Sequence, residues 1–329
     1  MSGIDFRMLS SRALAAAAVV GMALTFAPVM AQAQEEDVTP REKWSFAGML
    51  GRFDRAQLQR GYQVYKEVCS NCHSLRLVKY RNLAEPGGPG FTEAQVKTLA
   101  AEAEFEDAFD DSGNPVKRKG LPSDAFKSPF PNVAAARAAN NGAVPPDLSL
   151  MAKAREAALD IPFYLVWLKW GREVLNGYQE GGTDYIHALL TSFHEQAPAY
   201  VADAGGKLTE VPEDKAPKDA LRCATVSAGE PGKPDICNKV GDGLYFNTAF
   251  PGHQLAMPPP LSDGQVTYSD GTPATVDQYA RDVAAFLSWT ADPNLEVRKE
   301  MGLRMMIYLI ILAGILWLAK RSMWSRVKH

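Results

Sequence analysis

The residues with the most evident chemical potential are Cys69, Cys72 and His73, which form a Cys-x-x-Cys-His run. Two thiols three positions apart at the end of a helix can add across both vinyl groups of one haem, and the adjacent histidine can then ligate the iron. The run therefore predicts one covalently bound haem c, with Cys69 and Cys72 as attachment sites and His73 as an axial iron ligand.

The Cys-x-x-Cys part of the run also occurs in zinc sites and in thiol-disulfide exchange. Structural zinc takes four ligands, and the other cysteines, Cys223 and Cys237, are more than 150 positions away with no nearby histidine pair. A redox dithiol usually accompanies a βαβ unit, whereas the preceding segment has the spacing of one helix face, carried by Leu58, Tyr62, Tyr65, Cys69 and Cys72. Haem attachment is the better interpretation.

A second axial ligand can be sought among the eleven methionines and five histidines. Once the two ends of the chain are set aside, Met49, Met151 and Met257 remain, and core packing in a helix-like segment accounts for Met151. Met257 precedes three prolines, whose fixed φ and missing N–H groups hold an extended backbone that can present a side chain. A thioether opposite histidine also raises the reduction potential. Met257 is favoured, with three alternatives: His253, His187 and His194.

The first 33 residues have the features of a secretory signal peptide. Arg7 and Arg12 precede an apolar stretch over residues 13–30, and Ala31-Gln32-Ala33 precedes an acidic segment. This pattern predicts cleavage after Ala33, with a retained anchor as the alternative. Because haem is attached to thiols outside the bacterial cytoplasm, the leader and the Cys-x-x-Cys-His run support each other.

The C-terminal end has the composition of a membrane anchor. Residues 305–319 are free of charge, and the apolar run extends back to Met301 if Arg304 snorkels, which is enough to span about 30 Å of hydrocarbon. Four basic residues follow, so the positive-inside rule places the C-terminus in the cytoplasm. We therefore predict a periplasmic domain over residues 34–297 and a single transmembrane helix with a short tail over residues 298–329. A buried core helix is the alternative.

Helix signals predominate between leader and anchor. Thr92 with Gln95 and Thr275 with Gln278 have the spacing of capping boxes, and a further helix follows Asp160. One side of the last of the soluble helices should pack against the helix that leads into Cys69, through Tyr279, Val283, Phe286, Leu287 and Thr290. Strand signals are weak, so the fold class is mainly α with long loops.

The charge is unevenly distributed. The whole chain has a net charge of −3, but residues 34–297 hold 26 basic and 36 acidic residues. Six acids without a base fall within ten positions: Glu102, Glu104, Glu106, Asp107, Asp110 and Asp111. Such a run is either a solvated helix face or an acidic field that steers a basic soluble partner. The sign excludes nucleic acid as a partner.

A loop region over residues 196–247, rich in Gly, Pro and acids, contains Cys223 and Cys237. In an oxidising compartment, two cysteines 14 positions apart that are not used for haem attachment most simply form a disulfide. The chain-entropy model gives such a bridge about 3 kcal/mol of stabilisation. Free thiols are the alternative.

Four segments share their order and spacing with one known family. They are Cys-Ser-Asn-Cys-His-Ser-Leu at 69–75, Arg-Ala-Ala-Asn-Asn-Gly-Ala-Val-Pro-Pro-Asp-Leu-Ser at 137–149, Phe-Pro-Gly-His leading to Met-Pro-Pro over 250–259, and residues 289–302 ahead of the anchor. Together they resemble cytochrome c1 of the bc1 complex, over nearly the whole mature chain. The Asn-Asn-Gly-x-x-Pro-Pro-Asp-Leu-Ser segment is specific to that family.

The resemblance implies a class I cytochrome c-like haem domain with long loop insertions and a C-terminal transmembrane helix. It implies His73 and Met257 as the axial pair, with Pro145 and Pro146 packed near the ring. Two further residues resemble positions near the haem propionates, Arg155 and Tyr185. Gln179 departs from the family pattern, since some members carry an arginine there. The loop with Cys223 and Cys237 is similar to a disulfide-bearing insertion of bacterial members.

The resemblance also implies a function in the bacterial inner membrane. The haem would receive single electrons from a Rieske iron-sulfur protein and pass them to a soluble or membrane-tethered cytochrome c, in a dimeric complex with cytochrome b. This activity requires no general base or nucleophile from the chain. The alternatives are a haem peroxidase or sensor with an open iron position, and a haem-carrying anchor subunit of another respiratory enzyme.

Overall fold

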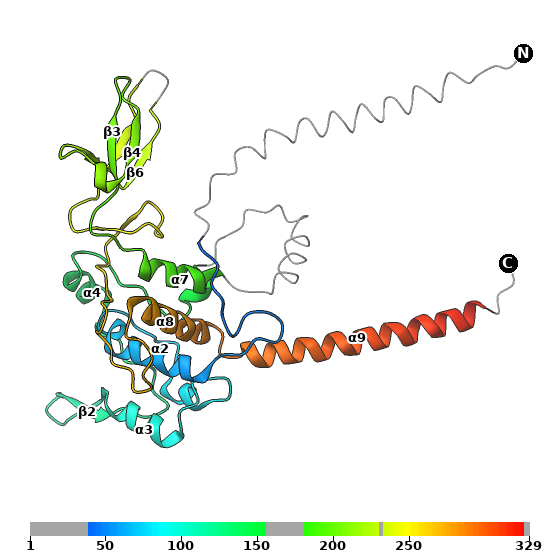
Figure 1. Ribbon diagram of the computed structural model, residues 1–329. Helices are drawn as coiled ribbons and strands as arrows, with labels where there is room; N and C mark the ends of the chain where they lie inside the picture. Colours follow the sequence, from blue (N-terminus) through cyan, green and yellow to red (C-terminus); the bar gives the residue numbers. More distant parts are fainter. Residues whose placement is uncertain (1–38, 156–180, 230–232, 326–329) are drawn as a thin grey trace, which may run out of the picture. The chain divides into compact units, whose positions relative to one another are not determined.

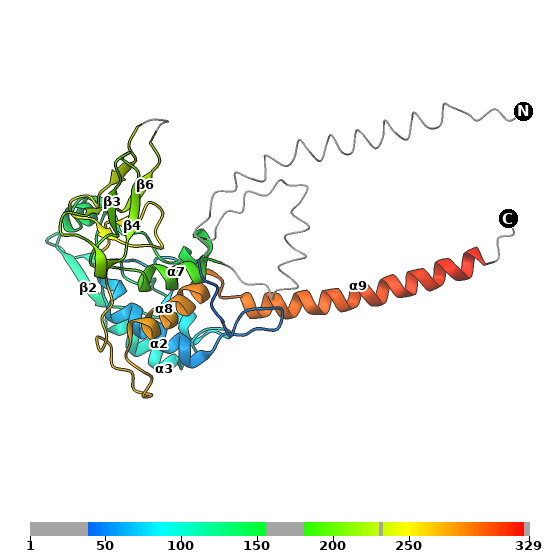
Figure 2. The same cartoon turned by 45° about the horizontal axis from the view of Figure 1, so that its top comes forward.

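A computed structural model describes residues 39–155, 181–229 and 233–325, which contain the helices and strands drawn in Figures 1 and 2. The predicted signal peptide, the helix after Asp160 and Gln179 lie outside these residues. The helices are α2 (Arg55–Glu67), α3 (Glu93–Ala101), α4 (Val133–Ala139), α5 (Met151–Ala154), α7 (Gly181–Thr191), α8 (Val276–Ala291) and α9 (Leu295–Trp324).

The core forms where α2 crosses α8, side by side in both views (Figures 1 and 2). The ring of Phe286 on α8 lies 5.9 Å from Tyr62 and 6.0 Å from Tyr65, measured between ring centroids. Helix α7 packs on α8, and Thr183 donates a hydrogen bond of 3.1 Å to Ser288 between them. The packing predicted between the last soluble helix and the helix before Cys69 is confirmed.

Gly61 allows this close crossing. A Cβ atom at Gly61 would lie 2.1 Å from the carbonyl oxygen of Asp282 and 2.7 Å from Cβ of Phe286. Because backbone cannot yield as a flexible side chain does, we expect Gly61→Ala to separate the helices and to cost about 3 kcal/mol of unfolding free energy. Urea unfolding followed by circular dichroism would measure this loss, and an unchanged midpoint would contradict the tight crossing.

The predicted helix starts are present. The hydroxyl of Thr92 accepts from the backbone N–H of Gln95 at 3.2 Å, and the Gln95 side chain accepts from the N–H of Thr92 at 2.8 Å. The hydroxyl of Thr275 likewise accepts from the N–H of Gln278 at 3.3 Å. Each bond satisfies an amide that the first turn leaves without an intrahelical partner.

The strands are short, and all pairs between them are antiparallel. One sheet has the order β4-β3-β5, and three two-stranded sheets pair β1 with β2, β6 with β7 and β8 with β9. Their bounds are β1 (Glu104–Phe109), β2 (Pro115–Lys119), β3 (Ala199–Ala202), β4 (Leu208–Val211), β5 (Leu221–Arg222), β6 (Thr225–Ser227), β7 (Ile236–Asn238), β8 (Tyr245–Phe246) and β9 (Gln254–Leu255).

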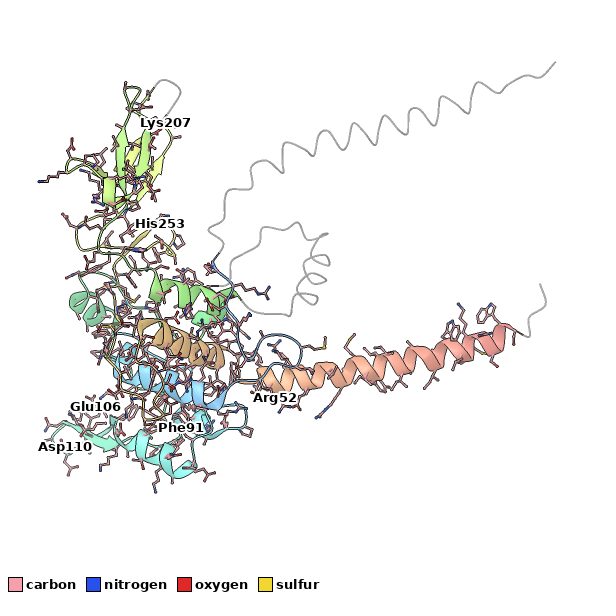
Figure 3. All side chains as sticks on the ribbon, in the orientation of Figure 1. Arg52, Phe91, Glu106, Asp110, Lys207 and His253 are labelled. Atoms are coloured by element: carbon pink, nitrogen blue, oxygen red, sulfur yellow. A yellow bond between two sulfur atoms is a disulfide. The ribbon has the colours of Figure 1, made fainter. Side chains whose placement is uncertain are left out.

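The acidic run does not form a helix face, and that interpretation is wrong. Most of it lies on strand β1 and the turn to β2, where Figure 3 labels Glu106 and Asp110. Glu104 pairs in register with Lys119, and Glu106 with Lys117. Opposite charges on facing strand positions favour this hairpin.

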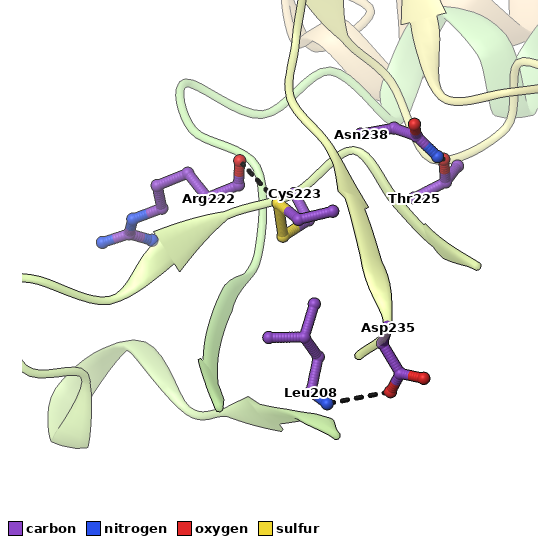
Figure 4. The surroundings of a disulfide bond; sticks show 7 residues. Leu208, Arg222, Cys223, Thr225, Asp235 and Asn238 are labelled. Carbon is purple, nitrogen blue, oxygen red and sulfur yellow. Dashed lines mark hydrogen bonds between the residues drawn. A yellow bond between two sulfur atoms is a disulfide. The ribbon is translucent and has the colours of Figure 1, made fainter. Parts of the chain in front are cut away.

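The predicted disulfide between Cys223 and Cys237 is confirmed (Figure 4). The two Cα atoms are 5.2 Å apart, and Cys223 is fully buried. The bridge ties the residue after β5 to strand β7, and the Asp235 carboxylate nearby accepts a 2.9 Å hydrogen bond from the N–H of Leu208. The bridge thus holds the small sheets together.

Among the described residues, α9 is the one helix long and apolar enough to cross a membrane. It begins at Leu295, three residues before the predicted anchor boundary. Leu295 itself is buried, whereas the side chains from Met305 to Leu309 are exposed. One continuous helix therefore joins the folded domain to the apolar span.

Candidate haem site

The Cys-x-x-Cys-His run lies directly after α2. A 3₁₀ turn over Cys69–Asn71 follows the helix, and the backbone N–H groups of Cys72 and His73 donate to the carbonyl of Cys69 at 3.1 and 2.8 Å. Both thiols are free, with Cys69 half-buried and Cys72 exposed. Burial raises the pKa of the Cys69 thiol to about 12. The turn presents two unpaired thiols and a histidine at the edge of the core.

The imidazole of His73 is held in one orientation. Its Nδ1 lies 2.8 Å from the carbonyl oxygen of Pro146, which can only accept a hydrogen bond. Nδ1 therefore carries the proton and donates, so that Nε2 keeps a lone pair for a metal. Burial lowers the pKa of His73, against the opposing effects of the Pro146 bond and the charge of Asp147. Burial thus favours the neutral imidazole, and the bond to Pro146 fixes its orientation.

A hydrogen-bond network fixes the Pro-Pro-Asp-Leu-Ser segment against the histidine. The Asp147 carboxylate accepts from the hydroxyl of Ser74 at 2.7 Å and from the backbone N–H of Arg76 at 3.0 Å. The N–H of Leu148 donates to the carbonyl of Ser74 at 2.9 Å. Although burial raises the pKa of Asp147, the donors around it hold that pKa below its usual range.

Sequence reasoning missed Ser74 and Asp147 as supports of the site. The sequence feature that could have indicated this role is the position of Asp147 directly after two prolines. The short side chain of an aspartate can accept hydrogen bonds from nearby backbone amides. Its partners lie more than 70 positions earlier in the chain, so spacing alone did not identify them. The carbonyl oxygen of Pro146 lies beside His73, and the packing of Pro145 and Pro146 near a haem ring stays a prediction.

Tyr185 and Arg155 show, independently of the cysteines and His73, whether the site suits a haem. The hydroxyl of Tyr185, on α7, is buried and has no hydrogen-bond partner within the described part of the chain. Burial raises the pKa of Tyr185, and the positive charge of the nearby Arg155 opposes this rise. An unused O–H donor beside a guanidinium suits a carboxylate such as a haem propionate. The donor set therefore fits the predicted cofactor.

Met257 is half-buried and lies in a bend two residues after the end of β9. The rival methionines are placed differently. Met49 is 56% exposed in a turn, and Met151 starts the short helix α5 and packs against the core. Met257 is thus the one of the three that is partly buried and lies outside a helix, and its ligation of the iron stays a prediction.

The rival histidines have other surroundings. Nε2 of His187 lies 3.0 Å from the carboxylate of Asp277, and its Nδ1 lies 4.0 Å from that of Glu42. The rings of His194 and His253 each lie 6.0 Å from the ring of Phe246. Because both ring nitrogens of His187 face carboxylates, we interpret His187 as a residue that stabilises the fold and not as an iron ligand.

The two attachment thiols give a direct prediction. In Cys69→Ser, one thioether should be lost while Cys72 still attaches the haem, because each thiol reacts with a different vinyl group. The pyridine haemochrome α-band should then shift to longer wavelength, because one vinyl group stays conjugated with the ring. Ser70→Ala, one position away, is the matched control. A spectrum of Cys69→Ser equal to the parent would contradict the assignment.

These observations define a c-type haem protein with one apolar helix after its haem domain. Comparison with known proteins agrees, since a model of the Cytochrome C1 family matches residues 44–327. Cytochrome c1 from Rhodospirillum rubrum is 41% identical over 97% of this chain and 98% of its own length. Cytochrome c1 from Blastochloris viridis is 38% identical over 99% of this chain and 98% of its own length.

A third relative is longer. The protein named cytochrome b/c1 from Bradyrhizobium diazoefficiens is 44% identical over 88% of this chain, which spans 36% of that protein. The chain belongs to the cytochrome c1 family. It accordingly carries one covalently bound haem c.

Proposed function

We propose that the chain is the electron-transfer subunit of a cytochrome bc1 complex, which takes electrons from a Rieske iron-sulfur protein and reduces a soluble or membrane-tethered cytochrome c. The 2.8 Å bond from His73 to the Pro146 carbonyl carries the proposal, because it builds a fixed, neutral nitrogen ligand next to two attachment thiols. Family membership supplies the expected partners, cytochrome b and the Rieske protein.

The bound haem supplies a one-electron couple. In the proposed site, Cys69 and Cys72 would hold the porphyrin, and His73 and Met257 would ligate its iron. Tyr185 and Arg155 would donate hydrogen bonds to a propionate, and Pro145 and Pro146 would pack near the ring. An imidazole nitrogen and a thioether of this chain as iron ligands would keep exogenous ligands out, as electron transfer requires.

The proposal extends to the organisation of the chain. Residues 1–33 are a signal peptide, residues 34–297 a periplasmic class I cytochrome c-like domain with loop insertions, and residues 298–329 an anchor with a cytoplasmic tail. The Gly61 crossing of α2 and α8 supports the class I assignment, and the basic residues after α9 support the orientation. The complex is a dimer in the bacterial inner membrane.

The test of this function is purification of the tagged full chain from its native membrane. We expect cytochrome b and a Rieske protein to copurify, and quinol to reduce the haem through them. Copper or flavin subunits in their place would redirect the proposal to another respiratory enzyme. Ready binding of carbon monoxide to the reduced protein would indicate an open iron position and favour a peroxidase or sensor.

The acidic hairpin β1–β2 gives a further prediction. Glu104 lies 3.5 Å from Lys117, whereas Glu106 and Asp111 are exposed. If the hairpin steers a basic cytochrome c, Glu106→Gln with Asp111→Asn should slow its reduction at low salt and flatten the salt dependence. Rapid-mixing kinetics over a salt series would measure both. Equal slopes in parent and variant would leave the run as a solvated surface.

A further inference from the structure

A tight turn over residues 45–52 presents two apolar side chains to solvent. The backbone N–H of Arg52 donates to the carbonyl of Ser45 at 3.1 Å, and Gly48 has a φ of 73°. Met49 is 56% exposed and Leu50 75% exposed at the tip of this turn. Three aromatic residues beside the tip are buried in the core: Trp44, Phe46 and Phe53. The exposed pair therefore sits on a rigid support.

The same turn is fixed to the start of α9. The guanidinium of Arg52 lies 2.6 Å from the carboxylate of Glu300, and that of Arg55 lies 2.8 Å from Glu296. The backbone N–H of Phe53 donates to Glu296 at 2.9 Å, and the ammonium of Lys299 donates to the carbonyl of Phe46. The turn lies beside the first turns of α9 in Figures 1 and 2, and Figure 3 labels Arg52 there.

These contacts set the height of Leu50 relative to the apolar span. Glu300 directly precedes Met301, where the uncharged part of α9 begins apart from Arg304. Leu50 is two residues from Arg52, so its backbone lies at most about 7 Å from that of Arg52, whose side chain reaches Glu300. The interfacial layer on each side of the hydrocarbon is roughly 5–7 Å thick. The turn thus reaches that layer if α9 spans the membrane.

We propose that Met49 and Leu50 form a second membrane contact, inserted into the lipid interface beside the anchor. The inference rests on the proposed membrane anchoring by α9. Lipid is the occupant that the surroundings favour, because the exposed pair lies on a turn that is held by ion pairs to the start of the apolar helix α9. Arg52 and Arg304 both pair with Glu300, which leaves net positive charge at headgroup level. A helix and a turn together fix the tilt of the haem domain, which a helix alone does not.

The test uses the full haem-loaded chain in phosphatidylcholine–phosphatidylglycerol nanodiscs, with a nitroxide attached at Leu50→Cys. Collisions with oxygen, which concentrates in lipid, are compared with collisions with a water-soluble nickel chelate. Phe109→Cys is the matched control, since Phe109 is also 75% exposed and lies on β1. Ile310→Cys, at 66% exposed on α9, reports whether the anchor is inserted. We expect the oxygen-to-nickel ratio at Leu50 to exceed that at Phe109 several-fold.

Other outcomes would overturn the inference in distinguishable ways. A lipid-like ratio at Ile310 with a water-like ratio at Leu50 would reject the second contact and keep the anchor. A water-like ratio at Ile310 would reject the anchor and, with it, the contact. Loss of collisions with both reagents at Leu50, seen only in the assembled complex, would identify a protein neighbour instead. Met49→Cys repeats the measurement if labelling disturbs Leu50.

Discussion

Replacing Met257 by His should lower the midpoint potential of the haem by on the order of 100 mV or more, since axial ligand identity shifts haem potentials over about 0.8 V. The thioether favours ferrous iron, whereas a second imidazole stabilises the ferric state. The covalent haem should persist because Cys69 and Cys72 are untouched. A spectroelectrochemical titration measures the potential, and the pyridine haemochrome measures the haem content.

The matched control is Met49→His, at a methionine in an exposed turn. It should leave the potential unchanged. If Met257→His also left it unchanged, Met257 would not be an iron ligand, and the same titration on His253→Ala and His194→Ala would examine the remaining alternatives. Steady-state cytochrome c reduction should slow in Met257→His, because a lower haem potential makes electron transfer from the Rieske protein to the haem unfavourable, although onward transfer to cytochrome c gains driving force.

The helical part of the fold was accessible from sequence because its determinants are local. The spacing of Tyr62 and Tyr65 marked the buried face of α2, and the Thr275–Gln278 pair marked the start of α8. In each case the residues that form the pattern are only a few positions apart in the chain. The disulfide was accessible for a chemical reason, since Cys223 and Cys237 were the cysteines that haem attachment did not use.

The rest of the site depends on long-range contacts that no local pattern encodes. The bond from His73 to Pro146 and the pairing of Ser74 with Asp147 each join residues 73 positions apart. The short strands were missed for a related reason, because a strand of two to six residues is stabilised by its partner rather than by its own pattern. Hence no local pattern predicts the hairpin in which Glu106 pairs in register with Lys117.

A second large effect is expected at the crossing of α2 and α8, where Arg60→Met should cost roughly 3–5 kcal/mol of unfolding free energy. The Asp282 side chain is 0% exposed, and it accepts from Arg60 at 2.9 Å and from Gln278 at 2.9 Å. Removing the guanidinium leaves a buried carboxylate without its counter-charge. The exposed pair Arg81–Glu85 is the matched control, and Arg81→Met should cost less than about 1 kcal/mol.

The double variant Arg60→Met with Asp282→Leu separates two possible causes of the lost stability, namely a buried charge left without its partner and a lost helix register. If the penalty comes from stranding a charge, an apolar pair of similar volume should recover most of the lost stability, because the desolvation of both ions disappears with them. If the pair instead sets the helix register, the double variant should stay as unstable as Arg60→Met. Asp270 also binds Arg60, at 2.9 Å, but its exposed carboxylate can return to water. Guanidinium unfolding of the four proteins in this cycle measures the coupling, and we expect the charge-stranding outcome.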